Sequence, residues 1–146
     1  MPRTPCALRP CLVIILAGLA LAGLAGCGGG TYPVSGRLEY EDGEPIREMT
    51  GCTISFTSEQ LGVEARGEIQ EDGGFRLGTK RPDDGAPPGT YKVIVAQPHP
   101  EPERPEKRRP VVDLSYEDPQ TTPLEATVEP KRNDFTFKLK RLKGKK

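Results

Sequence analysis

Hydrophobic and polar residues alternate over short stretches of this chain. A period of two is typical of a half-buried β-strand, because successive side chains point to opposite faces of a sheet. Clusters of Gly, Pro and Asp separate these stretches, and no window sustains a helical period. The pattern predicts about seven strands, near residues 34–40, 52–57, 63–70, 75–77, 91–96, 124–129 and 135–139.

Two Asp-Gly turns punctuate the first half of this pattern. Asp42-Gly43 follows the first expected strand and Asp72-Gly73 follows the third. Both residue types tolerate the positive φ that tight turns need. We expect the second turn to join the strands at 63–70 and 75–77 as a hairpin.

Short strands with such turns predict an all-β fold, a two-sheet β-sandwich. The core should be aromatic, because six rings share the inward phase of their strands. These are Tyr40, Phe56, Phe75, Tyr91, Phe135 and Phe137.

The N-terminus has a different pattern. Arg3 and Arg9 precede an apolar run over residues 12–25 that contains no polar side chain. This order is typical of a secretory signal peptide, which we expect to form a helix. A membrane-spanning helix needs roughly 20 apolar residues, so the run is too short for a stable span.

The apolar run ends in Leu24-Ala25-Gly26-Cys27. These four residues resemble the bacterial lipobox, which implies cleavage before Cys27 and attachment of acyl chains such as palmitate to it. Residues 1–26 are then a lipoprotein signal peptide, and residues 27–31 a lipidated, Gly-rich tether. The alternative is an ordinary signal peptide with Cys27 as a plain thiol.

Charge and cysteine content narrow the class further. The chain has 21 basic and 21 acidic residues, and loss of the two signal-peptide arginines leaves a slightly acidic mature protein. That balance argues against a nucleic-acid partner. We expect Cys6 and Cys11 to leave with the signal peptide and Cys27 to be acylated, so the mature chain should form no intramolecular disulfide. The inward strand phase of Cys52 predicts that it is a small residue of the core.

Five segments of the mature chain carry a family resemblance. They are Val34-Ser-Gly-Arg-Leu, Tyr40-Glu-Asp-Gly-Glu-Pro-Ile, Cys52-Thr-Ile-Ser-Phe, Asp72-Gly-Gly-Phe-Arg-Leu and Pro88-Gly-Thr-Tyr-Lys-Val-Ile-Val. In this order they resemble the carboxypeptidase-regulatory-like domain, a transthyretin-like β-sandwich of many exported bacterial proteins. Members of that family are generally non-catalytic, so the resemblance implies a protein that is not an enzyme.

The resemblance and the strand pattern together define the expected domains. The β-sandwich should span residues 32–140 and contain a Pro-rich exposed loop at 98–110. Residues 141–146 should form a basic tail. That tail, with Lys138 and Lys140, either solubilises the protein or touches anionic lipid head groups or an envelope polymer.

Residues with catalytic or metal-binding chemistry are sparse. His99, the only histidine, lies between two prolines, and Pro102 stands where a His-x-x-Glu zinc motif needs Glu. We therefore expect no catalytic residue, metal or cofactor. An enzyme would need acids from distant loops to converge on His99.

Three acidic pairs, Glu41-Asp42, Glu71-Asp72 and Asp83-Asp84, lack the alternating spacing of a calcium loop. We expect them to be turn residues, with a weak divalent-cation site as the alternative.

A Lys–Asn isopeptide crosslink, found in some transthyretin-like domains, is not expected. The first strand offers Arg37 in place of a lysine, and Asn133 flanks the last strand at a turn-like segment.

These observations predict a lipid-anchored, non-catalytic domain of the cell envelope with a structural or protein-interaction role. The contact would use a sheet edge or the 98–110 loop, with an envelope protein or polymer as partner. Gly28, where an inner-membrane signal would have Asp, favours the outer membrane or its periplasmic face. The alternative is a module that binds carbohydrate or another small ligand. Tyr32 and Tyr116 are the only aromatic residues left for such a site.

Overall fold

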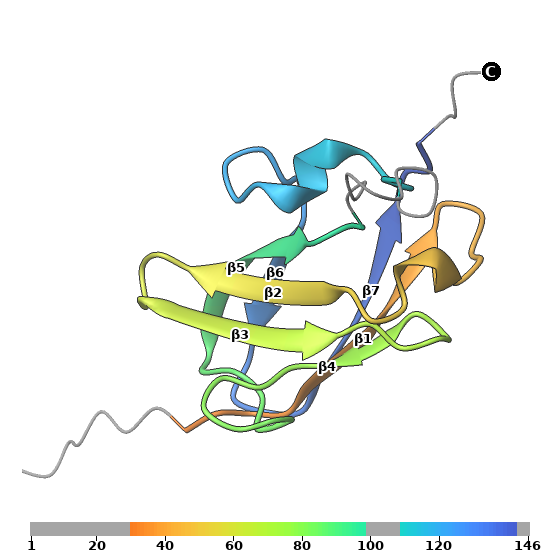
Figure 1. Cartoon of the computed structure of the whole chain (residues 1–146). Coiled ribbons are helices and arrows are strands. Elements are labelled where there is room, and N and C mark those ends of the chain that lie inside the picture. The colour runs from red at the N-terminus through yellow and green to blue at the C-terminus, as the bar shows by residue number, and fades with distance from the viewer. Residues whose placement is uncertain (1–29, 99–108, 143–146) are drawn as a thin grey trace, which may run out of the picture.

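The structure, a computed structural model, describes residues 30–98 and 109–142 (Figure 1). Cys27 with its lipobox and His99 lie outside these ranges. The described strands are β1 (Val34–Tyr40), β2 (Thr53–Ser58), β3 (Val63–Glu68), β4 (Gly74–Arg76), β5 (Gly89–Val95), β6 (Glu125–Val128) and β7 (Asn133–Leu139). Two short 3₁₀ helices, η1 (Arg47–Met49) and η2 (Leu114–Glu117), were not predicted.

The strands form two sheets, with orders β4-β1-β7 and β3-β2-β5-β6. All described pairings are antiparallel except that of β1 with β7, which runs parallel from Val34 opposite Asn133 to Tyr40 opposite Leu139. Figure 1 shows the first and last strands side by side. The predicted all-β sandwich is confirmed.

The prediction that β3 and β4 pair as a hairpin is wrong, although the turn between them is present. The turn forms, because the Gln70 N–H donates to the Gly74 carbonyl at 2.8 Å. Farther along, Arg66 and Gly78 exchange two backbone hydrogen bonds. Between these points β4 pairs with β1 in the other sheet, with Gly36 opposite Phe75. The chain thus crosses from one sheet to the other at this corner.

The core is aromatic, as the strand phases predict. The Phe56 ring is fully buried, and its centroid lies 5.7–6.2 Å from those of four other rings. Three of them come from the opposite sheet, so Phe56 joins the two layers. The four neighbours are Phe75, Tyr91, Phe135 and Phe137. Of all six predicted core rings, only Phe135 is half-buried.

Gly36 makes room for one of these rings. A Cβ added there would lie 2.6 Å from the Phe75 ring and closer still to the Phe135 carbonyl oxygen. A glycine within a strand often marks such a close approach. Gly36 therefore lets β1 lie between β4 and β7 with an aromatic ring directly above its backbone.

The end of β7 is more ordered than the predicted tail. The backbone of Arg141 pairs with that of Val112 in an isolated antiparallel β-bridge, and the Leu142 N–H donates to the Val111 carbonyl at 2.8 Å. The Arg141 guanidinium carbon lies 3.7 Å from the centroid of the Tyr40 ring. The tail therefore cannot begin at residue 141, because Arg141 and Leu142 belong to the folded domain.

Candidate interaction site

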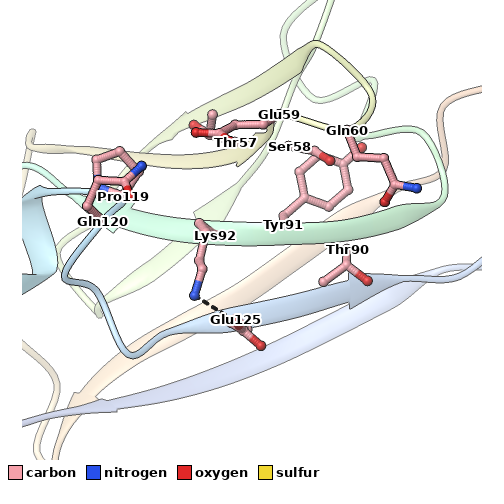
Figure 2. A pocket seen from close by; sticks show the side chains of 10 residues that line it. All are labelled: Thr57, Ser58, Glu59, Gln60, Thr90, Tyr91, Lys92, Pro119, Gln120 and Glu125. Atoms are coloured by element: carbon pink, nitrogen blue, oxygen red, sulfur yellow. Dashed lines mark hydrogen bonds and ion pairs between the residues drawn. The ribbon is translucent and has the colours of Figure 1, made fainter.

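A groove of about 450 Å³ crosses the outer face of the four-stranded sheet (Figure 2). Pro119 and Gln120 stand at one end of it, and Gln60 stands at the other. Thr57, Lys92 and Glu125 lie side by side on β2, β5 and β6. The Lys92 Nζ lies 2.6 Å from the Glu125 Oε1.

The groove offers hydroxyl, amide and charged groups. Tyr91 contributes no stacking surface, because it is buried and its hydroxyl donates to the Pro87 carbonyl at 2.7 Å. Burial also raises the pKa of Tyr91. The ten residues that line the groove include no histidine or cysteine. This surface can form hydrogen bonds with a polar ligand.

The outer edge of β7 is a second candidate surface. The Asn133 N–H donates to the Pro33 carbonyl at 2.9 Å, so Asn133 turns its backbone groups toward β1. In a parallel pair, alternate residues of a strand face the same neighbour. Asp134, Thr136 and Lys138 therefore turn their N–H and carbonyl groups away from β1.

Within the described ranges, β7 pairs with no strand other than β1. Among residues 30–98 and 109–142, the contacts along its outer edge lie beyond the end of the strand. There the Lys140 N–H donates to the Tyr116 hydroxyl at 3.2 Å, and Val112 pairs with Arg141. The side chains of Asp134, Thr136 and Lys138 are exposed. We call these three residues, with their outward backbone groups, the β7 edge.

The outer edges of β3 and β6 present fewer unpaired backbone groups than that of β7. Arg66, at the middle of the β3 edge, is bonded to Gly78. On β6, the Leu124 carbonyl accepts from the Val93 N–H, so only Glu125 and Thr127 of that strand turn outward. The β7 edge is therefore the longest open edge of those compared.

The acidic pairs act within turns. Asp42 accepts from the Glu44 N–H, and Asp72 accepts from the Gly74 N–H. Asp84 accepts from the N–H groups of three successive residues, 79–81. Desolvation would raise the pKa of Asp84, but these hydrogen bonds outweigh it and lower the pKa. Among the described residues, no three acidic, His or Cys side chains gather to hold a metal ion.

Tyr116 is not available as a binding aromatic. It lies in η2, it is 7% exposed, and its hydroxyl accepts from the Lys140 N–H. The sequence hypothesis missed this because Tyr116 lies outside any alternating stretch. Tyr32 is half-buried and bridges to Ala86 through its backbone. The two residues therefore do not form an exposed aromatic pair.

The side chains of Cys52 and Asn133 contribute to packing and to a turn, respectively. Cys52 precedes β2 and packs, half-buried, against the core, so the prediction of a core position is only partly correct. Asn133 is buried, and its amide holds the preceding turn by hydrogen bonds with Glu129 and Lys131. Arg37 lies on the outer face, 3.5 Å from Asp72.

Acidic side chains surround the end of β7 at Arg141. Its guanidinium lies 3.2 Å from Glu44 and 3.7 Å from Asp42. Glu48 accepts a hydrogen bond from the Tyr40 hydroxyl at 3.2 Å. Desolvation, reinforced by the charge of Glu48, raises the pKa of Tyr40 to about 12. We call Tyr40, Arg141 and these acids the C-terminal clamp.

No protein-family model, curated protein or solved structure matches this chain. The carboxypeptidase-regulatory-like family and the lipoprotein class therefore stay predictions from the sequence. In the described part of the chain, no helix has the length and hydrophobicity needed to cross a bilayer.

Proposed function

We propose that this protein is a lipid-anchored, non-catalytic domain of the cell envelope that binds another polypeptide by strand addition at the β7 edge. The anchor would be Cys27, and the β-sandwich would be the rigid body that presents the edge. In strand addition, a peptide in extended conformation pairs with an exposed sheet edge through main-chain hydrogen bonds.

One observation carries this proposal: three consecutive outward-facing residues of β7 have backbone groups turned away from β1. Exposed edges are usually blunted, and the charged side chain of Lys138 limits unselective pairing. Main-chain groups supply affinity in strand addition, while neighbouring side chains supply selectivity. An edge with Asp134 and Lys138 therefore suits a partner strand of complementary charge.

A pair of substitutions at Thr136 tests the use of this edge. Thr136→Pro removes an outward N–H, while the β1–β7 hydrogen bonds use the backbone of residues 135 and 137. Thr136→Ala keeps the N–H and is the matched control. The full chain would be crosslinked in intact cells, purified from detergent-solubilised envelopes and examined by mass spectrometry.

We expect proteins captured by the wild type and by Thr136→Ala to be lost from Thr136→Pro. Equal capture by all three would show that the β7 edge is not the contact. Thermal unfolding of each variant shows whether Thr136→Pro is folded. Cys27→Ser should abolish labelling with radioactive palmitate and release the protein from membranes, and retained labelling would refute the anchor.

A second candidate function is binding of a carbohydrate or another small polar ligand in the groove of Figure 2. The groove's volume of about 450 Å³ lies within the range of small-molecule sites. Its hydroxyl and amide groups match the hydrogen-bonding needs of sugar hydroxyls. Saturation-transfer NMR with envelope oligosaccharides should give a signal that weakens in Gln60→Ala and persists in Ser35→Ala. No signal from the wild type would refute this function.

A further inference from the structure

We propose that the strand bound at the β7 edge is β7 of a second copy of this chain, antiparallel and centred on Thr136. The inference rests on the proposed function in that both use the same edge. It adds the identity of the partner and the register of the contact.

The direction of the backbone groups restricts the register. The outward groups belong to residues 134, 136 and 138, as the Asn133–Pro33 hydrogen bond requires. In an antiparallel pair, directly opposed residues exchange two hydrogen bonds only where both turn their groups toward each other. A two-fold axis can therefore pass through a hydrogen-bonded pair centred on 134, 136 or 138, or through a non-hydrogen-bonded pair centred on 135 or 137.

Charge and the number of free backbone groups select among these five registers. Centring on Phe135 opposes Lys138 to Arg132 of the second copy, and centring on Phe137 opposes Asp134 to Lys140, whose N–H is already bonded to the Tyr116 hydroxyl.

Centring on Asp134 opposes that carboxylate to its own copy, and centring on Lys138 opposes two ammonium groups. Centring on Thr136 places Asp134 opposite Lys138 of the second copy, and does so twice by symmetry. Opposite charges directly across a strand pair stabilise it, whereas like charges destabilise it. The Thr136 register is therefore the favoured one.

The surroundings of the edge limit its length. The backbone N–H of Lys140 already donates to the Tyr116 hydroxyl, so the hydrogen-bond ladder between the two copies ends after residue 138. Three opposed pairs remain, and an isologous contact of this kind closes at two copies. The half-buried Phe135 would face Phe137 of the second copy, which gives its exposed part an apolar neighbour.

Charge reversal tests the register. Asp134→Lys and Lys138→Asp each turn two attractive contacts into two repulsive ones, so each variant alone should self-associate about tenfold more weakly than wild type. An equimolar mixture of the two variants restores both attractive contacts, and so does the double variant. Sedimentation equilibrium of the full chain in detergent would measure each dissociation constant.

Disulfide trapping tests the centre of the register. Cα atoms of directly opposed, hydrogen-bonded residues lie about 5.5 Å apart, within disulfide range. Thr136→Cys should therefore give a covalent dimer on oxidation beyond any formed by the wild type. Asp134→Cys is the matched control, because in this register the two introduced cysteines would lie about 14 Å apart.

Recovery of association in the mixture, with trapping at 136 and not at 134, would support the inference. Unchanged association in either single variant, or a mixture no stronger than its components, would overturn it. A wild-type protein that is monomeric would also overturn it. If self-association fails these tests but Thr136→Pro still abolishes capture of a different protein, the proposed function survives. If self-association fails and Thr136→Pro captures the same proteins as Thr136→Ala, both proposals are refuted.

Discussion

Phe56 is the side chain through which the two sheets make their central contact, and its removal should be costly. The ring is fully buried, and three of its four aromatic neighbours belong to the opposite sheet. Phe56→Ala removes most of this contact and leaves a cavity between layers that cannot close without moving a sheet.

Truncation of a buried phenylalanine to alanine costs about 3–5 kcal/mol. Domains of this size are stable by about 5–15 kcal/mol, so the variant should stay folded at low temperature with a small margin. A loss of that size corresponds to a Tm lowered by roughly 15 °C. Phe56→Leu refills part of the volume and should cost less.

Urea unfolding followed by circular dichroism would measure the free energy of unfolding. Thr57→Ala is the matched control, because the next side chain along β2 points to the outer face; it should change stability by less than about 0.5 kcal/mol. If Phe56→Ala lost under about 1 kcal/mol, the two sheets would not be joined through this ring.

Three further predictions concern the C-terminal clamp and β1. The pKa of Tyr40 is raised by folding to about 12. Its contribution to stability is therefore complete below the unfolded pKa of about 10 and is lost as pH rises toward 12. Across this pH window the free energy of unfolding should fall more steeply for the wild type than for Tyr40→Phe. Parallel pH curves for the two proteins would contradict the raised pKa of Tyr40. Arg141→Ala removes the cation–π contact and should cost about 1 kcal/mol in urea unfolding. Arg141→Lys should recover part of that, whereas full stability in the alanine variant would mean that the clamp contributes nothing. Gly36→Ala should cost about 3 kcal/mol, because the added methyl meets backbone that cannot move aside; a neutral result would show that β1 is not held so closely.

The strands and their faces could be predicted because these properties are local. Alternation identifies a strand and its inward side without knowledge of its neighbours. The aromatic residues of β1, β2 and β5 were placed inward on this basis, and they are buried. Asp-Gly turns are equally local, since the backbone conformation they favour depends on two residues. The roles of Asp42 and Asp72 followed for the same reason.

Strand pairing could not be predicted in the same way. β4 follows β3 after a tight turn, yet it pairs with β1, some forty residues earlier in the chain. The choice depends on where the Phe75 ring finds space, which is above Gly36. No local pattern contains that information. The irregular segment at 109–117 was missed as well, because its buried residues, Val112 and Tyr116, do not alternate.

The candidate interaction site shows the same division. The sequence by itself determined that residues 135–139 form a strand with Thr136 and Lys138 on its polar face, and it placed Asp134 in the turn before that strand. Only the tertiary structure decided that this strand lies at the edge of a sheet, parallel to β1, with its outward backbone open as far as Lys138. Side-chain alternation is set by the pleat of one strand, whereas an open edge depends on which other strands are absent from its side.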